Sequence, residues 1–263
     1  MQQDEMKTDA IPMYQMNPTS LFSGRATDYA LYRPSYPTEA IATILEGLDH
    51  PSQLVVADIG AGTGIASRLL GDRGIRVFAI EPNTEMRQAA IPHSLVEFRE
   101  ATAEETYLDD ASVDLVTCFQ SFHWFDPSPT LLEFRRILKS SGRLALVWGI
   151  WDEDDVFTRE LSRLVFRASN NHPGLPSRES MVSALLDNPH FHHVRQTSFA
   201  YQQQLELPGL IGLAQSQGFV PNSGQKKQQL VTDLQKLYEQ GADSSGKVCV
   251  LYRTDVYLAE PTA

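Results

Sequence analysis

The sequence has few of the features that mark secreted, disulfide-bonded or membrane-spanning proteins. Its 263 residues include two cysteines, Cys118 and Cys249, which both lie inside apolar runs. This placement favours reduced, buried thiols over a disulfide framework or a metal pair. No apolar stretch approaches the length of a membrane span, and Met1–Met16 lacks the apolar region of a signal peptide. We therefore expect a cytoplasmic protein without a membrane partner.

Basic residues are scarce as well. The chain has 22 lysines and arginines against 33 aspartates and glutamates, a formal net charge of −11, and no Lys/Arg-rich run. Nucleic-acid-binding domains usually carry a basic face, so we expect no nucleic-acid partner. The length allows one large domain, or one domain with an insertion. We expect residues 1–19 to form a flexible segment, residues 20–263 to form the domain, and the protein to be a monomer or a weak homodimer.

The most informative stretch is Leu54–Ile65, which reads Leu-Val-Val-Ala-Asp-Ile-Gly-Ala-Gly-Thr-Gly-Ile. Its apolar beginning predicts a buried parallel strand. Gly60, Gly62 and Gly64 occupy alternate positions, which is typical of a tight turn where backbone approaches a ligand closely. Ile65–Leu70 predicts the first turns of a helix whose N-terminal amides face the same ligand. The stretch indicates a nucleotide-type cofactor site at the end of a strand, the alternative being an ordinary glycine-rich loop.

The spacing of the glycines bears on the identity of the cofactor. The dinucleotide-binding fingerprint has a glycine or alanine at the sixth position of the pattern, and counting from Gly60 that position holds Ile65. The observed pattern is Gly-x-Gly-x-Gly with an acid, Asp58, two residues before it. This pattern resembles motif I of the class I S-adenosylmethionine (SAM) methyltransferases.

Strand and helix patterns alternate along the first 150 residues. After a short helix within 22–33 that ends before Pro34, we expect strands at 54–59, 75–80, 95–100, 113–119 and 143–148, and helices at 37–48, 65–71, 84–90 and 129–138. The last of these helices should stop at Ser140-Ser141-Gly142. Such alternation predicts an α/β fold with a doubly wound, mostly parallel sheet that has helices on both faces.

The alternation breaks after Trp151. We expect helices at 156–169, 178–186, 208–217 and 225–240, and strands at 191–201 and 248–258. A bare antiparallel pair of strands needs only a short connection, whereas a long stretch separates these two. We therefore expect a helical cap within 151–224 that lies, together with residues 22–36, over the crevice beside Gly60 and His123. The alternative is that these helices only cover the sheet edge.

Two further segments follow strand ends on the side of the glycine turn. Glu81 ends the second strand, about 20 residues after the turn, where an acid binds ribose hydroxyls. Pro82 and Met86 would then lie near the adenine, and Ala103 and Glu104 follow the third strand, where such folds bind the adenine amino group. The alternative interpretation is that Glu81 and Glu104 are solvated surface acids.

The fourth strand is followed by Gln120-Ser-Phe-His-Trp-Phe125. His123 is placed to take a proton from an acceptor hydroxyl, or alternatively it is a structural histidine. Trp124 and Phe125 either line the cofactor site or pack the loop on the sheet. A sulfonium is attracted to aromatic faces, and the candidates for this contact are Tyr29, Trp124 and Trp148.

Several motifs together resemble one family. They are Phe22…Tyr29…Arg33-Pro34…Tyr36-Pro37, Asp58-Ile-Gly-Ala-Gly-Thr-Gly64, Glu81-Pro82-Asn83, Ala103-Glu104 and Gln120-Ser-Phe-His-Trp-Phe-Asp126. This combination resembles the type 11 SAM-dependent methyltransferases, in the branch that contains the trans-aconitate methyltransferase-like proteins. The similarity covers roughly residues 20–150, and 215–217 and 250–257 resemble the same branch less specifically.

The resemblance implies a Rossmann-like, seven-stranded sheet whose last strand is antiparallel. It implies SAM as cofactor and S-adenosylhomocysteine as its product, with Tyr29 and Arg33 over the methionine end, where a guanidinium suits a carboxylate. His123 is the expected catalytic residue. The expected cofactor-binding residues are Tyr29, Arg33, Asp58, Gly60, Ala61, Gly62, Gly64, Glu81, Pro82, Met86, Ala103, Glu104, Gln120 and Trp124.

No metal is expected at the histidine cluster His190, His192 and His193, because no cysteine or carboxylate follows at metal-ligand spacing. Three functions remain open from the sequence. The first is methyl transfer from SAM to a small-molecule acceptor, a carboxylate or a hydroxyl, by in-line displacement. The second is an NAD-dependent oxidoreductase, which Ile65 and the Ala103-Glu104 pair disfavour. The third is a non-catalytic SAM-binding protein.

Overall fold

The computed structural model describes residues 13–16, 22–170 and 178–262. Seven strands form one sheet in the order β3-β2-β1-β4-β5-β7-β6. All neighbouring strands are parallel except β7, which runs antiparallel to both β5 and β6. The expected seven-stranded sheet with an antiparallel last strand is therefore confirmed. The strands are β1 Val55–Ile59, β2 Arg76–Ile80, β3 Val96–Arg99, β4 Val113–Phe119, β5 Leu138–Trp151, β6 Phe191–Leu205 and β7 Val248–Pro261.

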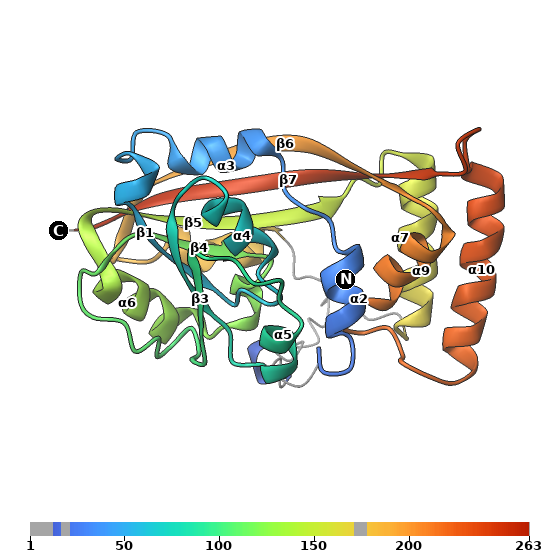
Figure 1. The fold of residues 1–263 in the computed structure, drawn as a ribbon, viewed down its shortest axis with the longest axis horizontal. Helices are drawn as coiled ribbons and strands as arrows, with labels where there is room; N and C mark the ends of the chain where they lie inside the picture. The colour runs from blue at the N-terminus through green and yellow to red at the C-terminus, as the bar shows by residue number, and fades with distance from the viewer. Residues whose placement is uncertain (1–12, 17–21, 171–177, 263) are drawn as a thin grey trace, which may run out of the picture.

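Helices cover both faces of the sheet, as expected for strands that are buried on both sides. One face packs against α3 (Thr38–Leu45) and α4 (Ile65–Gly71), which contribute Ile41, Ile44 and Leu70 to a fully buried cluster. The other face packs against α6 (Pro127–Ile137) and α8 (Arg178–Leu186). The short helix α5 (Thr84–Gln88) follows β2. Figure 1 shows α3 and α6 on opposite sides of the strands.

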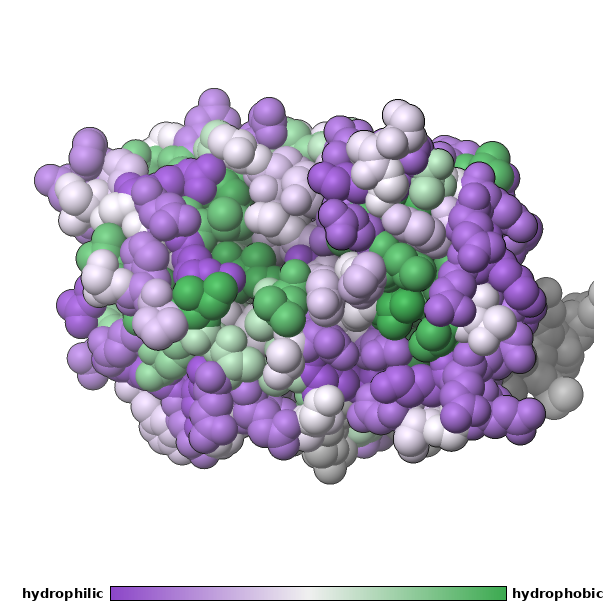
Figure 2. Space-filling model, turned by 45° about the vertical axis from the view of Figure 1, so that its right-hand side comes forward, coloured by the Kyte–Doolittle hydropathy of each residue, from purple (hydrophilic) through white to green (hydrophobic). Residues whose placement is uncertain are grey.

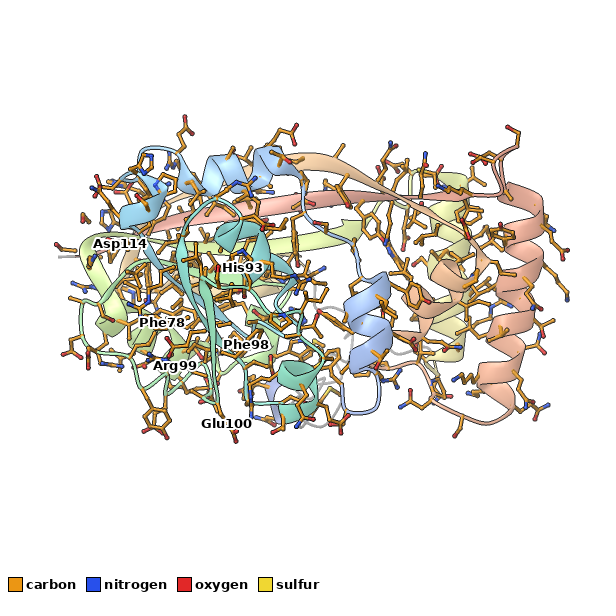
Figure 3. All side chains as sticks on the ribbon, viewed as in Figure 1. Phe78, His93, Phe98, Arg99, Glu100 and Asp114 are labelled. Carbon is orange, nitrogen blue, oxygen red and sulfur yellow. The ribbon has the colours of Figure 1, made fainter. Side chains whose placement is uncertain are left out.

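Asp114 of β4 connects the two neighbouring strands, β1 and β5, at one end of the sheet. Its carboxylate accepts a hydrogen bond from the Val55 amide at 2.9 Å and forms an ion pair with Lys139 Nζ at 2.7 Å. On β2 and β3, the Arg99 guanidinium lies 4.1 Å from the centre of the Phe78 ring. Figure 3 labels Asp114, Phe78 and Arg99 on the ribbon.

The strand β5 begins five residues earlier than the sequence predicts, and Ser140, Ser141 and Gly142 lie within it. The pairing explains the difference, because Val113 of β4 pairs with Leu138 whereas Leu115 pairs with Arg143. This irregularity accommodates the extra residues of β5 in the ladder. Residues typical of a helix stop therefore form a bulged part of a strand.

The long strands β5, β7 and β6 continue beyond the rest of the sheet towards a group of helices (Figure 1). This cap consists of α2 (Ala26–Tyr32), α7 (Val156–Ala168), α9 (Leu207–Gln215) and α10 (Gln225–Gly241). Its helices share a third apolar cluster, formed by residues such as Leu161, Leu213 and Leu234, with the extended ends of the strands.

The cap differs from the expected 151–224 region in two respects. The helix α8 lies outside it, because Val182 and Leu185 are buried in the cluster that contains Phe134 of α6. The helix α10 lies inside it, because Leu230 and Leu234 are buried against α7 and α9. The position of each helix thus depends on where its apolar face is buried, and not on the order of the helices in the chain.

The segment 1–19, which we expect to be flexible, includes one short described element. Met13–Gln15 form the short helix η1, which contacts η3 (Phe122–Trp124) after β4. The Met13 side chain is buried there. The remaining residues of 1–19 lie outside the described part of the chain. Within the described ranges, no helix is long and apolar enough to cross a membrane.

Hydrophobic residues on the visible surface gather in small groups among hydrophilic ones (Figure 2). Leu31, Tyr107 and Val156 are the most exposed large apolar side chains of the described residues, and they lie on different elements. Scattered apolar exposure of this kind is ordinary for a folded protein, and it does not by itself indicate an interface.

Candidate functional site

The glycine turn joins β1 to α4, and its backbone requires glycine. Gly60 has φ +66° and Gly62 has φ +59°, in the left-handed region that glycine adopts without penalty. A Cβ on Gly60 would lie 2.6 Å from the Ser121 Cβ atom and 2.8 Å from the Phe125 ring. A Cβ on Gly62 would lie 3.3 Å from the Met86 methyl group. The turn is therefore packed closely by α5, which follows β2, and by the segment that follows β4.

Glu81, at the end of β2, holds this turn. One carboxylate oxygen accepts a hydrogen bond from the Gly62 amide at 2.8 Å, and the other accepts one from the Asn83 amide at 2.8 Å. Burial raises the pKa of Glu81, while these backbone hydrogen bonds oppose the shift. A carboxylate has about four lone-pair positions, so each oxygen retains capacity for a ligand hydroxyl.

Asp58, two residues before the turn, is fully surrounded by protein. Its two oxygens accept hydrogen bonds from Ser67 Oγ at 2.5 Å and from Thr117 Oγ1 at 2.9 Å. Burial raises the pKa of Asp58 to about 6, against the effect of these two hydroxyls. Asp58 therefore connects β1 to α4 and β4, and these contacts stabilise the two elements that the turn joins.

A cavity of about 330 Å³ opens beside the turn, and we call it the strand-end cavity. Ten of the fourteen expected cofactor-binding residues line it: Tyr29, Gly60, Gly62, Glu81, Pro82, Met86, Ala103, Glu104, Gln120 and Trp124. Phe125, for which the sequence left two positions open, lines it too, and so do Tyr14, Phe22 and Asn83, which were not among the expected cofactor-binding residues. Residues from every strand end between β1 and β4 are thus brought to one space.

The remaining four expected residues lie beside this cavity. Arg33, Asp58 and Ala61 line an adjoining space of about 30 Å³, next to the Gly60 side of the turn. Gly64 precedes the first turn of α4 with φ +73° and lines neither space. It supports the turn through its backbone conformation.

Glu104 has protein partners. Its Oε1 atom lies 3.3 Å from the Asp126 amide and 3.5 Å from Thr130 Oγ1, which act as donors. Glu104 therefore connects the loop after β3 to the start of α6. It lines the strand-end cavity at the same time, so the interpretation of a purely solvated acid does not fit its position.

A second cavity, of about 340 Å³, lies under the cap, and we call it the cap cavity. It shares Phe22, Tyr29, Gln120 and Trp124 with the strand-end cavity. Most of its other walls come from residues that the sequence analysis did not identify, including Trp151, Val165, Phe166, Leu213, Phe219 and Tyr252. No local pattern marks these residues as a site, because they come from β5, α7, α9, the loop after α9 and β7, and they meet only in the folded chain.

Arg25, at the start of α2, attaches the N-terminal segment to the cap. Its guanidinium donates hydrogen bonds to the carbonyl oxygens of Gln215, at 2.8 Å, Gln217, at 3.0 Å, and Val220. On the other side of the same segment, the Gly24 amide donates to the Glu85 carboxylate at 2.6 Å. The segment therefore bridges the α5 side of the strand-end cavity and the cap.

Arg33, at the end of α2, borders the cap cavity and the small space beside Gly60. Its guanidinium carbon lies 4.7 Å from the centre of the Tyr29 ring, and Nη2 donates to the Ser216 carbonyl at 3.3 Å. Its Nε atom is buried without a hydrogen-bond partner among the described residues. No carboxylate pairs with it in the described ranges, so its positive charge is available to a ligand.

His123 lies in η3 and lines the cap cavity. Its Nδ1 atom accepts a hydrogen bond from the Trp148 indole N–H at 3.2 Å. Burial, and secondly the charge of Arg33, lower the pKa of His123 to about 3. Of the three candidate rings for a sulfonium contact, Trp148 does not fit, because it is 1% exposed and packs against Tyr257 in the core.

Gln120 forms the boundary between the two cavities. It has φ +54°, its amide donates to the Val147 carbonyl at 2.8 Å, and its side chain donates to the Gly149 carbonyl. These contacts turn the chain sharply at the end of β4. The sharp turn directs the following 121–125 segment across the carboxyl end of the sheet.

Two further expectations from the sequence need correction. Cys118 is buried, but Cys249 is only half-buried. The cluster of His192 and His193 does have a neighbouring carboxylate, because β7 brings Glu260 beside it, with potential ligand atoms within 4.8 Å of one another. A bulge in β6, with His193 at φ +51°, places the two consecutive histidines together. Sequence spacing could not reveal this proximity, since Glu260 lies 67 residues away from His193.

Comparison with known proteins agrees with this geometry. A family model described as a methyltransferase domain matches residues 57–146. An uncharacterized methyltransferase of Mycobacterium tuberculosis is 36% identical over 201 residues, which cover 75% of this chain and 76% of that protein. An uncharacterized methyltransferase-like protein of Schizosaccharomyces pombe is 28% identical over 203 residues, covering 76% of this chain and 78% of that protein.

Solved structures show the same fold. A methyltransferase from Anaeromyxobacter dehalogenans has a TM-score of 0.59 at 20% identity and covers 87% of this chain and 97% of its own. An antibiotic-pathway methyltransferase from Anabaena variabilis has a TM-score of 0.59 at 22% identity, covering 83% and 94%. These matches do not assign the chain to the trans-aconitate methyltransferase-like branch. They do agree with the glycine turn, the strand-end acid and the sheet order, and the chain therefore belongs to the class I SAM-dependent methyltransferases.

Proposed function

We propose that the protein transfers a methyl group from SAM to a small-molecule acceptor, a carboxylate or a hydroxyl, by in-line displacement. The observation that carries this proposal is the pair of adjoining cavities. The strand-end cavity lies at the glycine turn, the cap cavity lies under α7 and α9, and Phe22, Tyr29, Gln120 and Trp124 border both. Methyl transfer requires a donor and an acceptor site in contact, with the reacting atoms aligned.

The strand-end cavity is proposed to hold SAM, with S-adenosylhomocysteine as the product. Glu81 would bind the ribose hydroxyls through its remaining lone pairs, and Pro82, Met86 and Ala103 would surround the adenine. Arg33 and Tyr29 would lie over the methionine end, where the unpaired guanidinium suits a carboxylate. The fold neighbours of this protein include a phosphoethanolamine N-methyltransferase of Haemonchus contortus solved with S-adenosylhomocysteine, which has a TM-score of 0.55 at 14% identity.

The cap cavity is proposed to hold the acceptor. Its walls from α7, α9 and the N-terminal segment exclude water from the reacting atoms, and aromatic rings at the boundary stabilise a cationic sulfonium. Movement of the cap would let the acceptor enter and the product leave. The acidic composition supports a small-molecule partner rather than nucleic acid. A cytoplasmic location and a monomeric or weakly dimeric state belong to the same proposal.

A thermal-shift experiment tests the proposed cofactor. A ligand present at 100 times its dissociation constant stabilises the native state by about 2.7 kcal/mol, so SAM and S-adenosylhomocysteine should each raise the melting temperature. NAD should not, because Ile65 occupies the position that the dinucleotide fingerprint gives to a small residue. Stabilisation by NAD alone would favour the oxidoreductase alternative. Binding of SAM without transfer to any acceptor in a radiolabelled metabolite screen would favour a non-catalytic SAM-binding protein.

A further inference from the structure

The protonation state of His123 determines which acceptors the cap cavity can use. A hydroxyl acceptor at neutral pH needs a base to remove its proton, and the sequence suggested His123 for this role. A neutral imidazole has one N–H and one lone pair, on different ring nitrogens. The contacts of the His123 ring therefore decide whether the ring nitrogen left for a ligand gives or takes a proton.

The contact with Trp148 identifies the tautomer. An indole N–H only donates hydrogen bonds, and the Trp148 indole nitrogen lies 3.2 Å from His123 Nδ1. Nδ1 must therefore supply its lone pair, and the single proton of the neutral ring lies on Nε2. Trp148 cannot reverse its role, so this assignment does not depend on how hydrogen atoms are placed.

Both partners of this hydrogen bond are held rigidly. Trp148 lies in the second half of β5, is 1% exposed, and packs edge-on against Tyr257 with ring centres 5.7 Å apart. The η3 turn that carries His123 is closed by hydrogen bonds from the Trp124 and Phe125 amides, and it is anchored by the buried Phe122. Breaking the contact would leave the buried indole N–H without a partner, which is unfavourable.

The charges near the ring also disfavour a proton on Nδ1. Burial is the main reason that the pKa of His123 is lowered to about 3, and the guanidinium of Arg33 is the second. The two indole rings beside it, Trp148 and Trp124, the latter at 5.0 Å between ring centres, carry no charge. An imidazolium would have to displace the indole N–H and would lie near a like charge, so His123 remains neutral at physiological pH.

We propose that His123 is a permanently neutral hydrogen-bond donor, fixed by Trp148, and that with Arg33 it selects an acceptor that presents a delocalised oxyanion to the cap cavity. This inference rests on the proposed function. Arg33 has five N–H donors, of which one is used by the Ser216 carbonyl. It therefore retains donors for both cavities that it borders.

Methylation of such an acceptor needs no base. One oxygen of the oxyanion accepts hydrogen bonds from His123 Nε2–H and Arg33, and another oxygen attacks the methyl carbon. The oxygen–carbon bond forms as the sulfur–carbon bond breaks, and the electron pair of that bond returns to sulfur. The negative charge of the oxyanion and the positive charge of the sulfonium disappear together, and no proton moves.

The walls of the cap cavity indicate the rest of the acceptor. Trp151, Val165, Leu213 and Phe219 present apolar surface, which suits an apolar body. Glu153 also lines the cavity, so a second acidic group on the acceptor would meet a like charge. The preferred ligand is therefore an acid with a single anionic group and an apolar body, and polyacids are disfavoured.

The tautomer is tested by long-range 1H–15N NMR of the labelled protein between pH 5 and pH 8.5. The expected result is one neutral Nε2–H tautomer for His123 throughout, and no titration. In Trp148→Phe, which removes the indole donor and also reduces the volume of a buried ring, His123 should show both tautomers and titrate at higher pH. A titration of wild-type His123 near neutrality, or an Nδ1–H tautomer, would overturn the inference.

The choice of acceptor is tested by calorimetry on protein saturated with S-adenosylhomocysteine, using 4-phenylbutyrate, 4-phenylbutan-1-ol and trans-aconitate as probes. The acid should bind about tenfold or more tightly than the alcohol, because hydrogen bonds to a charged group are the stronger ones. Arg33→Gln should remove this preference, and His123→Gln, which keeps an N–H donor, should preserve more of it than His123→Ala. Equal binding of acid and alcohol, preferred binding of trans-aconitate, or no binding of any probe, would overturn the inference. Failure to bind S-adenosylhomocysteine would overturn the proposed function itself.

Discussion

Replacing Glu81 with glutamine tests the centre of the cofactor site. In the folded protein the carboxylate accepts hydrogen bonds from the Gly62 and Asn83 amides, each at 2.8 Å. A glutamine keeps the shape but has only one acceptor oxygen, so its NH2 group would face one of these two donors. We expect the turn to loosen and the site to lose a charged partner for the ribose hydroxyls.

The magnitude follows from the hydrogen bonds that are lost. A hydrogen bond to a charged group contributes about 1.5–3 kcal/mol. Since each 1.4 kcal/mol is a factor of ten, SAM affinity should fall by about 10- to 150-fold in Glu81→Gln. Titration calorimetry measures this change directly, and the melting temperature without ligand reports separately on the loosened turn.

The matched control is Glu97→Gln. Glu97 is exposed on the neighbouring strand β3 and pairs with Arg76 and Arg99 at the surface, away from both cavities. Exposed ion pairs contribute little, so this variant should bind SAM like the wild type. A folded Glu81→Gln protein with wild-type SAM affinity would refute the assignment of Glu81 to the ribose.

Three further predictions follow from the turn and the cap. Gly62→Val should fold but lose SAM binding in calorimetry, because valine is strained at φ +59°; normal binding would show that the turn tolerates a side chain. Burial raises the pKa of Asp58 to about 6, from an ordinary value of 3.8, so the folded state binds this proton more tightly than the unfolded chain does. The free energy of unfolding should therefore fall by roughly 3 kcal/mol as the pH rises between these two values. Urea titrations should show this slope in wild type and not in Asp58→Asn, and identical slopes would contradict it. S-adenosylhomocysteine should increase hydrogen-exchange protection in residues 22–36 and 205–221 as well as in the glycine turn; protection of the turn alone would mean that the cap does not close.

Much of the fold could be predicted because it depends on local patterns. Apolar runs of strand length, separated by helical periodicity, predict a parallel sheet, and α4 and β4 have the predicted bounds. The glycines and Glu81 could be identified because a turn with positive φ and a strand-end acid have distinct local sequences. Ten expected cofactor-binding residues lie in one cavity for the same reason, since parallel strands bring their carboxyl ends to one edge of the sheet.

Contacts between distant elements required the tertiary structure. The apolar faces of α8 and α10 are visible in the sequence, but only packing decides that α8 covers the sheet beside α6 and that α10 joins the cap. Arg25 is equally inconspicuous in the sequence, and its guanidinium gains its role from carbonyls 190 to 195 residues away. The bulges in β5 and β6 arise from registers set across the sheet.

His123 shows the difference most clearly. The sequence alone places a titratable ring after β4, facing the crevice, because its position depends on the order of the strands. Whether that ring is a base or a donor depends on Trp148, which lies 25 residues away on the next strand and holds Nδ1. Burial and the charge of Arg33 add to this effect. Chemical character of this kind is a property of the assembled surroundings, and the folded structure determined it.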